Sequence, residues 1–172
     1  MNTPLLLNIG SGQRPFVKPW INCDKQAVCK PDLIWDAGNP CDPPPFKPDT
    51  VDCIVLHHVL EHLPVERADL LLGQCLQLLK RHCSVLVFVP DMWELSAMWR
   101  EGKLSDDLYL ANVYGAYMGD EADRHKWGYT PATLRGKVRS AGFRWAHEFL
   151  RRDVWGADIA LDRWILAMEA VK

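Results

Sequence analysis

The chain has 172 residues, of which 48% are hydrophobic and 24% are charged, close to the globular average. Such a chain buries a core without disulfides or metals, and disorder, collagen and coiled coil are excluded. The net charge of −2 argues against a general electrostatic attraction to nucleic acid. No apolar run approaches the roughly 20 residues that cross a bilayer, and the start lacks the basic region of a signal peptide.

Short apolar runs alternate with helical patterns along the chain. Runs at residues 5–9, 20–24, 32–36 and 51–56 predict four strands, and a glycine-rich turn ends the first. Five prolines within nine residues separate the third strand from the fourth. Proline is excluded from helix interiors and central strands, so this segment is expected to be an ordered surface loop.

The strongest helical pattern follows the fourth strand. Apolar residues recur on one face from Leu63 to His82, which predicts a helix over this range. Lys80, Arg81 and His82 would then lie at its C-terminal end, where cations are favoured. The nearly all-apolar run at residues 84–89 predicts a strand that is buried on both faces.

The last part of the chain is harder to interpret. Residues 93–124 predict one or two helices. A Thr-Pro pair predicts the start of a helix over residues 130–140, and Gly142 lies just past its end. Residues 143–150 and 159–170 predict two last strands, although the second segment also fits a helix.

Strands that alternate with helices predict one α/β domain over residues 1–172, built on a mainly parallel sheet. The six cysteines invite a disulfide framework, but the chain is too large and too apolar to need one. No Cys-x-x-Cys pair occurs, which argues against a cysteine zinc site. We expect reduced, structural cysteines and a cytoplasmic location.

In an open parallel sheet, ligands bind outside the carboxyl ends of the strands. Polar residues gather there in this sequence, while the strands behind them are apolar. They are Gly10-Ser11-Gly12 after the first strand, Asp24 and Asp36 at the ends of the second and third, and His57-His58 after the fourth. This pattern predicts a binding site at that edge.

A glycine turn followed by an acid at the end of the second strand is typical of ribose recognition. Both a dinucleotide and a nucleoside sulfonium fit this pattern. A dinucleotide site needs the third glycine of G-x-G-x-x-G, which sets a helix N-terminus on the pyrophosphate. Pro15 stands in its place, and Pro19 leaves little further room for a helix. A cofactor without phosphate is therefore favoured.

Four segments carry a resemblance to a known family. They are Leu7-Asn8-Ile9-Gly10-Ser11-Gly12-Gln13-Arg14-Pro15, Trp20-Ile21-Asn22-Cys23-Asp24, His58-Val59-Leu60-Glu61-His62-Leu63 and His125-Lys126-Trp127-Gly128-Tyr129-Thr130-Pro131. Over residues 4–145 the chain resembles the class I S-adenosylmethionine-dependent methyltransferases, most of all their small predicted members. The resemblance implies a Rossmann-like α/β fold, with a mainly parallel seven-stranded sheet flanked by helices and a shortened first helix.

The resemblance also implies that S-adenosylmethionine is the cofactor. The glycine turn would line its methionine part and ribose, Asp24 would hold the ribose hydroxyls, and Asp36 with Ala37 would lie near the adenine amine. Many class I enzymes carry an acid where this chain has Asn8, so a charge near the cofactor's amino group is missing. The predicted cofactor-binding residues are Asn8, Ile9, Gly10, Ser11, Gly12, Asp24, Lys25, Asp36, Ala37 and His57.

Three histidines are candidate catalytic residues. Methyl transfer requires alignment of nucleophile, methyl and sulfur, and a base helps when the nucleophile carries a proton. His57 and His58 directly follow a buried strand, and His125 precedes the last helix. Because neighbours on a strand alternate sides, only one of the first two would face the cleft, and we expect it to be His57. The alternative is that these histidines form hydrogen bonds that hold their loops.

His58, Glu61 and His62 together match the H-x-x-E-H pattern of one zinc-peptidase class. That pattern needs a continuous helix, whereas here it follows a strand and is interrupted by Pro64. We therefore expect no metal, and we expect Glu61 to cap the helix that follows.

Two further features each have two interpretations. The basic and aromatic segment 124–129 suits a lid over the substrate, or a surface turn with Trp127 packed into the core. An aromatic group suits an acceptor pocket, or core packing on an amphipathic helix. Its members are Trp93, Trp99, Tyr109, Tyr114 and Tyr117.

The sequence therefore predicts a methyltransferase that acts on a small-molecule or glycan-type acceptor, with no nucleic-acid or membrane partner. The absence of an Asn/Asp-Pro-Pro-Tyr/Phe motif after the fourth strand argues against methylation of amino groups on bases or glutamine. One alternative is a catalytically inactive module of the same fold that binds the cofactor or its demethylated product. Another is a nucleotide-binding oxidoreductase, against which Pro15 argues.

Overall fold

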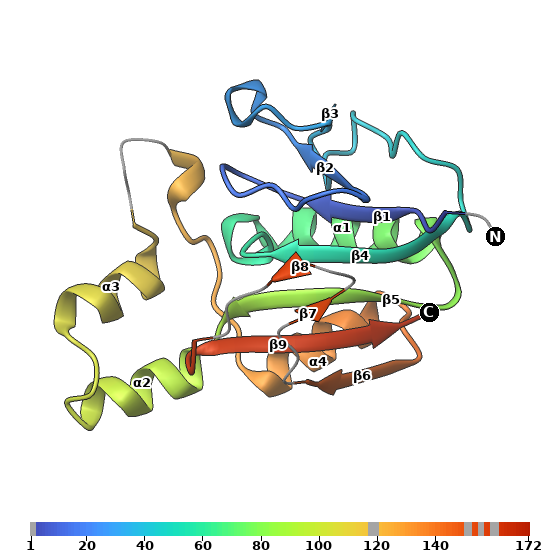
Figure 1. The fold of residues 1–172 in the computed structure, drawn as a ribbon. Helices are drawn as coiled ribbons and strands as arrows, with labels where there is room; N and C mark the ends of the chain where they lie inside the picture. Colours follow the sequence, from blue (N-terminus) through green and yellow to red (C-terminus); the bar gives the residue numbers. More distant parts are fainter. Residues whose placement is uncertain (1–2, 117–120, 150–152, 155–156, 159–161) are drawn as a thin grey trace.

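The computed structural model describes residues 3–116, 121–149, 153–154, 157–158 and 162–172. A seven-stranded sheet of order β3-β2-β1-β4-β5-β9-β6 forms its centre (Figure 1). Only the two pairings made by β9 are antiparallel, so the expected mainly parallel sheet is confirmed. The strands are β1 (Leu6–Ile9), β2 (Trp20–Asp24), β3 (Leu33–Ile34), β4 (Val51–His57), β5 (Leu79–Pro90), β6 (Trp145–Glu148) and β9 (Ile165–Val171).

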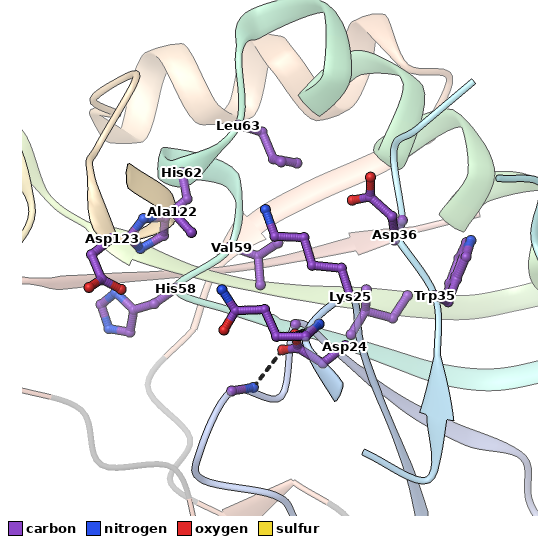
Figure 2. Close-up of a pocket in the computed structure, with 15 residues that line it drawn as sticks. Asp24, Lys25, Trp35, Asp36, His58, Val59, His62, Leu63, Ala122 and Asp123 are labelled. Atoms are coloured by element: carbon purple, nitrogen blue, oxygen red, sulfur yellow. Dashed lines mark hydrogen bonds between the residues drawn. The ribbon is translucent and has the colours of Figure 1, made fainter. Parts of the chain in front are cut away.

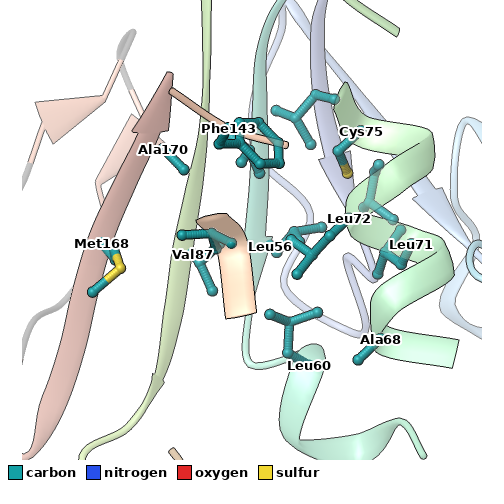
Figure 3. Packing of buried hydrophobic residues seen from close by; sticks show 14 of the residues in the cluster. Leu56, Leu60, Ala68, Leu71, Leu72, Cys75, Val87, Phe143, Met168 and Ala170 are labelled. Carbon is teal, nitrogen blue, oxygen red and sulfur yellow. The ribbon is translucent and has the colours of Figure 1, made fainter. Parts of the chain in front are cut away.

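Helices cover one face of this sheet more fully than the other. The larger buried cluster joins the apolar faces of α1 (Val65–Leu78) and α4 (Pro131–Ser140) to β4, β5 and β9 (Figure 3). A smaller cluster lies on the opposite face, where Phe16 of the β1–β2 connection packs against it. The remaining elements are α2 (Met92–Arg100), α3 (Asp106–Tyr114), η1 (Ala27–Cys29), η2 (Leu60–His62), η3 (Glu121–Asp123), β7 (Asp153–Val154) and β8 (Ala157–Asp158).

The prediction of α1 was wrong at its C-terminal end. The helix stops at Leu78, and Lys80, Arg81 and His82 belong to β5. Leu79 is fully buried and pairs with Val51 of β4, so sheet pairing overrides the helical pattern there. The Lys80 ammonium donates to Asp52 at 2.7 Å, which gives this cation a partner in the sheet.

Two predictions near the C-terminus are confirmed. Thr130 caps α4 through a reciprocal hydrogen-bond box with Thr133, and Pro131 occupies the first helical position. Gly142 follows the helix with a φ of +107°, a conformation that favours glycine. The last apolar segment, which fitted both strand and helix, forms strand β9. Residues 159–161 of that prediction lie outside the described residues.

The connection between β1 and β2 contains no helix at all over residues 10–19, whereas a shortened helix was expected. Hydrogen bonds from the Asn22 side chain fix this segment, which lacks the hydrogen bonds of a helix. Its carboxamide accepts from the Phe16 amide at 2.8 Å and donates to the Phe16 carbonyl at 2.9 Å. The chain therefore enters β2 from an irregular turn, and no helix N-terminus follows β1.

All six cysteines are free, as expected for structural thiols. Burial raises the pKa of Cys23, Cys53 and Cys75 to about 12, so their thiols stay protonated and unreactive near neutral pH. Within the described part of the chain, no helix has the length and apolar character needed to cross a membrane.

Neither interpretation of the aromatic group holds as a whole. Trp93 and Tyr114 are 74% and 66% exposed, so they do not pack into the core, and neither lines the pocket at the strand ends that is described below. Trp99 stacks on Tyr109 with ring centres 4.8 Å apart and joins α2 to α3. Trp127 is 53% exposed, so the interpretation of segment 124–129 as a turn with Trp127 packed into the core is wrong. Tyr117 lies outside the described residues.

Candidate active site

A pocket of about 200 Å³ opens at the carboxyl ends of the first strands, where the sequence predicted a site (Figure 2). We name three stretches of chain that carry its lining residues: the turn side (residues 9–12 and 24–26), the tryptophan side (35–37) and the histidine side (58–63 and 122–123). In Figure 2 the tryptophan and histidine sides face each other across Asp24 and Lys25. The lining residues are Ile9, Gly10, Gly12, Asp24, Lys25, Gln26, Trp35, Asp36, Ala37, His58, Val59, His62, Leu63, Ala122 and Asp123.

The two glycines of the turn side serve different purposes. Both have positive φ, +71° at Gly10 and +52° at Gly12, which explains why the turn needs glycine. A Cβ on Gly10 would lie 2.6 Å from a methyl of Val59, so this glycine permits close packing between the turn and the histidine side. A Cβ on Gly12 would meet no protein atom within 4 Å apart from its own chain neighbours. Gly12 therefore leaves space in the pocket open.

The Asp24 carboxylate is fixed at the end of β2. Its side chain is nearly buried, and both oxygens accept backbone hydrogen bonds, from Gly12 and from Gln26, each at 2.8 Å (Figure 2). A carboxylate oxygen has more than one lone-pair site, so each can accept a further hydrogen bond from a ligand. The acid thus both holds the glycine turn and presents acceptors to the pocket.

The tryptophan side is held by contacts outside the pocket. The Asp36 carboxylate accepts from Arg67 at 2.7 Å and from Asn39 at 2.9 Å. The Asp36 amide donates to the Asp42 carboxylate at 2.8 Å, and the Trp35 indole donates to the Asp42 carbonyl at 3.1 Å. These bonds connect the side to the proline-rich loop, which has no helix or strand over residues 39–49.

The two adjacent histidines are placed differently from the expectation. His58 lines the pocket, and its Nδ1 lies 2.8 Å from Glu61 Oε1. His57 does not line it; its ring packs edge-on against Phe88 with centroids 5.5 Å apart. Burial lowers the pKa of His57 to about 4, so the imidazole is neutral. The chain leaves β4 with a φ of +56° at His58, which turns that residue toward the pocket.

Glu61 does not cap α1, contrary to the expectation. The N-cap of α1 is Pro64, which makes no side-chain cap hydrogen bond. The Glu61 side chain is instead buried and faces histidines. Its carbonyl accepts from the amides of Lys126 and Trp127 at 2.6 and 3.2 Å, which joins the segment before α4 to η2.

His125 lies behind the histidine side and does not line the pocket. Its ring makes an edge contact with His62, with centroids 4.7 Å apart, and His62 does line the pocket. The His125 Nδ1 lies 2.8 Å from the Asn112 carbonyl. Burial lowers the pKa of His125 below its usual value, so its imidazole is neutral at pH 7.

Of the predicted site residues, eight line the pocket: Ile9, Gly10, Gly12, Asp24, Lys25, Asp36, Ala37 and His58. Asn8, Ser11, His57 and His125 do not. Asn8 is buried, and its side-chain amide donates to the Asn22 side chain at 2.9 Å. This hydrogen bond joins β1 to β2. Ser11 is also buried, and its hydroxyl has no partner among the described residues.

Seven lining residues were not predicted: Gln26, Trp35, Val59, His62, Leu63, Ala122 and Asp123. Three of them belong to the quoted motif at residues 58–63, and Gln26 and Trp35 adjoin predicted residues, so their positions carried a signal. Ala122 and Asp123 carried none, because only the tertiary fold brings η3 to the pocket.

No protein-family model and no curated protein matches the chain. The chain is, however, similar in structure to several solved proteins. A SAM-dependent methyltransferase from Archaeoglobus fulgidus is 19% identical, with a TM-score of 0.65 over 99% of this chain and 87% of that one. Another from Methanosarcina mazei is 10% identical, with a TM-score of 0.60 over 99% and 92%.

Human N-acetylserotonin methyltransferase, solved in complex with SAM, is 18% identical, with a TM-score of 0.59. The match covers 98% of this chain but 47% of the human one, so the chain spans about half the length of that enzyme. At these identities the likeness concerns the fold alone. The chain has the Rossmann-like fold of SAM-dependent methyltransferases.

Proposed function

We propose that this chain is an S-adenosylmethionine-dependent methyltransferase that acts on a small-molecule or glycan-type acceptor. The observation that carries the proposal is the Asp24 carboxylate, fixed at the end of β2 by the Gly12 amide at the edge of the pocket. Two ribose hydroxyls can donate to its oxygens. The open space beside Gly12 leaves room for the rest of the nucleoside.

The charges of the lining fit this cofactor better than a dinucleotide. The charged lining residues are Asp24, Asp36 and Asp123 against Lys25, and Arg67 pairs with Asp36 at 2.7 Å. A pyrophosphate would meet a small excess of negative charge here, and no helix N-terminus follows β1 to bind it. A sulfonium cation is favoured by the same charges. When bound, S-adenosylmethionine supplies an electrophilic methyl group.

His58 is the residue that we propose as general base, in preference to His57. The Glu61 carboxylate can only accept at His58 Nδ1, so Nδ1 carries the proton and Nε2 keeps its lone pair. The His58 side chain is 33% exposed, so Nε2 can reach a ligand. A buried carboxylate that orients a histidine in this way also stabilises the imidazolium formed when the base takes a proton.

The choice of acceptor class rests on charge and on the proposed base. A polyanionic acceptor such as nucleic acid would be repelled by the carboxylates of the lining, and the chain carries a net charge of −2. Alcohol and phenol hydroxyls are the groups for which a base such as His58 is most useful.

Equilibrium titration tests the cofactor. We expect calorimetry to show binding of S-adenosylhomocysteine, the demethylated product, and no binding of NAD. NAD binding without S-adenosylhomocysteine binding would overturn the proposal. A screen of hydroxylated small molecules and oligosaccharides with labelled S-adenosylmethionine then tests catalysis. Cofactor binding with no labelled product from any acceptor class would favour the inactive module.

A further inference from the structure

Three potential metal ligands meet behind the histidine side of the pocket. Glu61 and His62 belong to η2, and His125 comes from the segment before α4. One ligand atom from each residue lies within 4.8 Å of the others. The hydrogen bond from the Lys126 amide to the Glu61 carbonyl, at 2.6 Å, holds the two segments together.

The other polar atom of each side chain is already engaged. His62 Nδ1 lies 3.3 Å from the Arg124 carbonyl, and His125 Nδ1 lies 2.8 Å from the Asn112 carbonyl. A carbonyl can only accept, so both Nδ1 atoms carry the proton and both Nε2 atoms keep a lone pair. Metal-binding histidines are usually oriented by this kind of hydrogen bond.

Glu61 supplies an independent observation. Its side chain is 1% exposed, Oε1 is bonded to His58, and Oε2 has no hydrogen-bond partner among the described residues. A buried carboxylate oxygen without a partner is costly, and a cation would remove that cost. Lys126 and Arg124 of the neighbouring segment both pair with Glu121.

We infer that Glu61 Oε2 and the Nε2 atoms of His62 and His125 bind a divalent transition-metal ion of the zinc class. Two imidazoles and one carboxylate are a ligand set that zinc uses in catalytic sites, with one position left open. Ligand atoms around tetrahedral zinc are about 3.4 Å apart, so small side-chain rotations would close the 4.8 Å cluster.

Because His62 lines the pocket, a metal ion at this cluster would lie beside it. Water or another oxygen ligand can occupy the open coordination position. The metal would also connect η2 to the segment before α4 beyond the two backbone hydrogen bonds already present. The set differs from the H-x-x-E-H pattern in the sequence, because His125 takes the place of His58, which bonds to Glu61 instead.

Zinc titration of chelator-treated protein tests this inference without cofactor or acceptor. We expect calorimetry to show one bound Zn²⁺ per chain, and His62→Ala or His125→Ala to weaken binding roughly 100-fold or more. His147→Ala is the matched control, because His147 also lies near a carboxylate, 3.3 Å from Glu169, but has no second histidine in that pair. The control should bind zinc within about threefold of the wild type.

Two further variants control for zinc binding by thiols and test the role of Glu61. Replacing the three less buried cysteines, Cys29, Cys41 and Cys83, by serine removes thiols that compete for zinc and should leave the binding unchanged. Glu61→Gln should weaken binding as well, with circular dichroism as the check on folding. Absence of zinc binding by the wild type, or equal binding by the folded His62→Ala and His125→Ala variants, would overturn the inference. S-adenosylhomocysteine titrations of the same proteins report on the cofactor site separately.

Discussion

The turn side and the histidine side of the pocket are built in opposite ways. On the turn side the defining hydrogen bond joins Gly12 to Asp24, twelve residues apart, within one β-turn-β unit. On the histidine side the bond between His62 and Arg124 spans 62 residues. A local unit is specified by a short motif, whereas the histidine side exists only after the segment before α4 has folded against η2. Substitutions should therefore affect ligand binding on the first side and positioning on the second.

The largest effect is expected from Gly12→Val. The new side chain would enter space that holds no protein atom, so it should exclude the ligand and abolish S-adenosylhomocysteine binding in calorimetry. A positive φ at a non-glycine residue costs about 1–2 kcal/mol of stability. Gly102→Val is the matched control: its φ is +69° and its Cβ space is also open, but it lies outside the pocket. Similar loss of stability in both variants, with binding lost in neither, would show that the turn is merely structural.

The next largest effect is expected at His58, on the histidine side. His58→Ala should lower turnover about 100-fold or more if this residue is the general base. Affinity for S-adenosylhomocysteine should stay within about threefold, because the imidazole does not hold the nucleoside. Initial rates and calorimetry on the same preparation measure both quantities. If His57→Ala lowers turnover as much and His58→Ala does not, the assignment within this pair is reversed.

Asp24→Ala should weaken S-adenosylhomocysteine binding about ten- to a hundredfold. A hydrogen bond to a charged group contributes roughly 1.5–3 kcal/mol. The variant loses the hydrogen bonds that the ribose hydroxyls would donate to the carboxylate. It also frees the Gly12 amide, so the glycine turn loses its support. Asp24→Asn retains one oxygen for the Gly12 amide and replaces the other with a donor, so it tests the ribose contacts with less effect on the turn. An unchanged dissociation constant for both variants would remove Asp24 from the binding site.

The smallest effect concerns stability and the buried His57. In the unfolded chain this histidine takes up a proton near pH 6.5, whereas in the folded protein its pKa is lowered to about 4. As the pH falls below 6.5 the unfolded state binds more protons, so the free energy of unfolding decreases. Between pH 7.5 and pH 5 this one group should account for about 2 kcal/mol. Urea unfolding of His57→Gln at both pH values should show a correspondingly smaller decrease than the wild type.

The sequence predicted the turn side well because its determinants are local. The strand ending at Asp24, the glycine turn and the missing third glycine are all contained in fifteen consecutive residues from Gly10. Strands β1, β2 and β4 followed from their apolar runs, and α4 from its capping residues. The end of α1 was missed because pairing of Leu79 with β4 outweighs helix periodicity.

The histidine side could be predicted only in part. Side chains alternate along a strand, so the sequence indicated that only one of His57 and His58 would face the cleft. The positive φ at His58 breaks this alternation and turns His58 toward the pocket. In the sequence, residue spacing indicated a possible metal-binding pattern only within residues 58–62. That His125 completes a cluster with Glu61 and His62 depends on contacts between segments about sixty residues apart, which no periodicity encodes.

The proline-rich loop has a consequence for how fast the pocket accepts its ligand. Asp42 in this loop holds both Trp35 and Asp36, and the five prolines restrict the backbone even before folding. The tryptophan side therefore needs no ordering when a ligand arrives, and its entropy has already been lost in the folded chain. Association on this side should proceed as a simple encounter with a rigid surface, with a rate that rises linearly with ligand concentration.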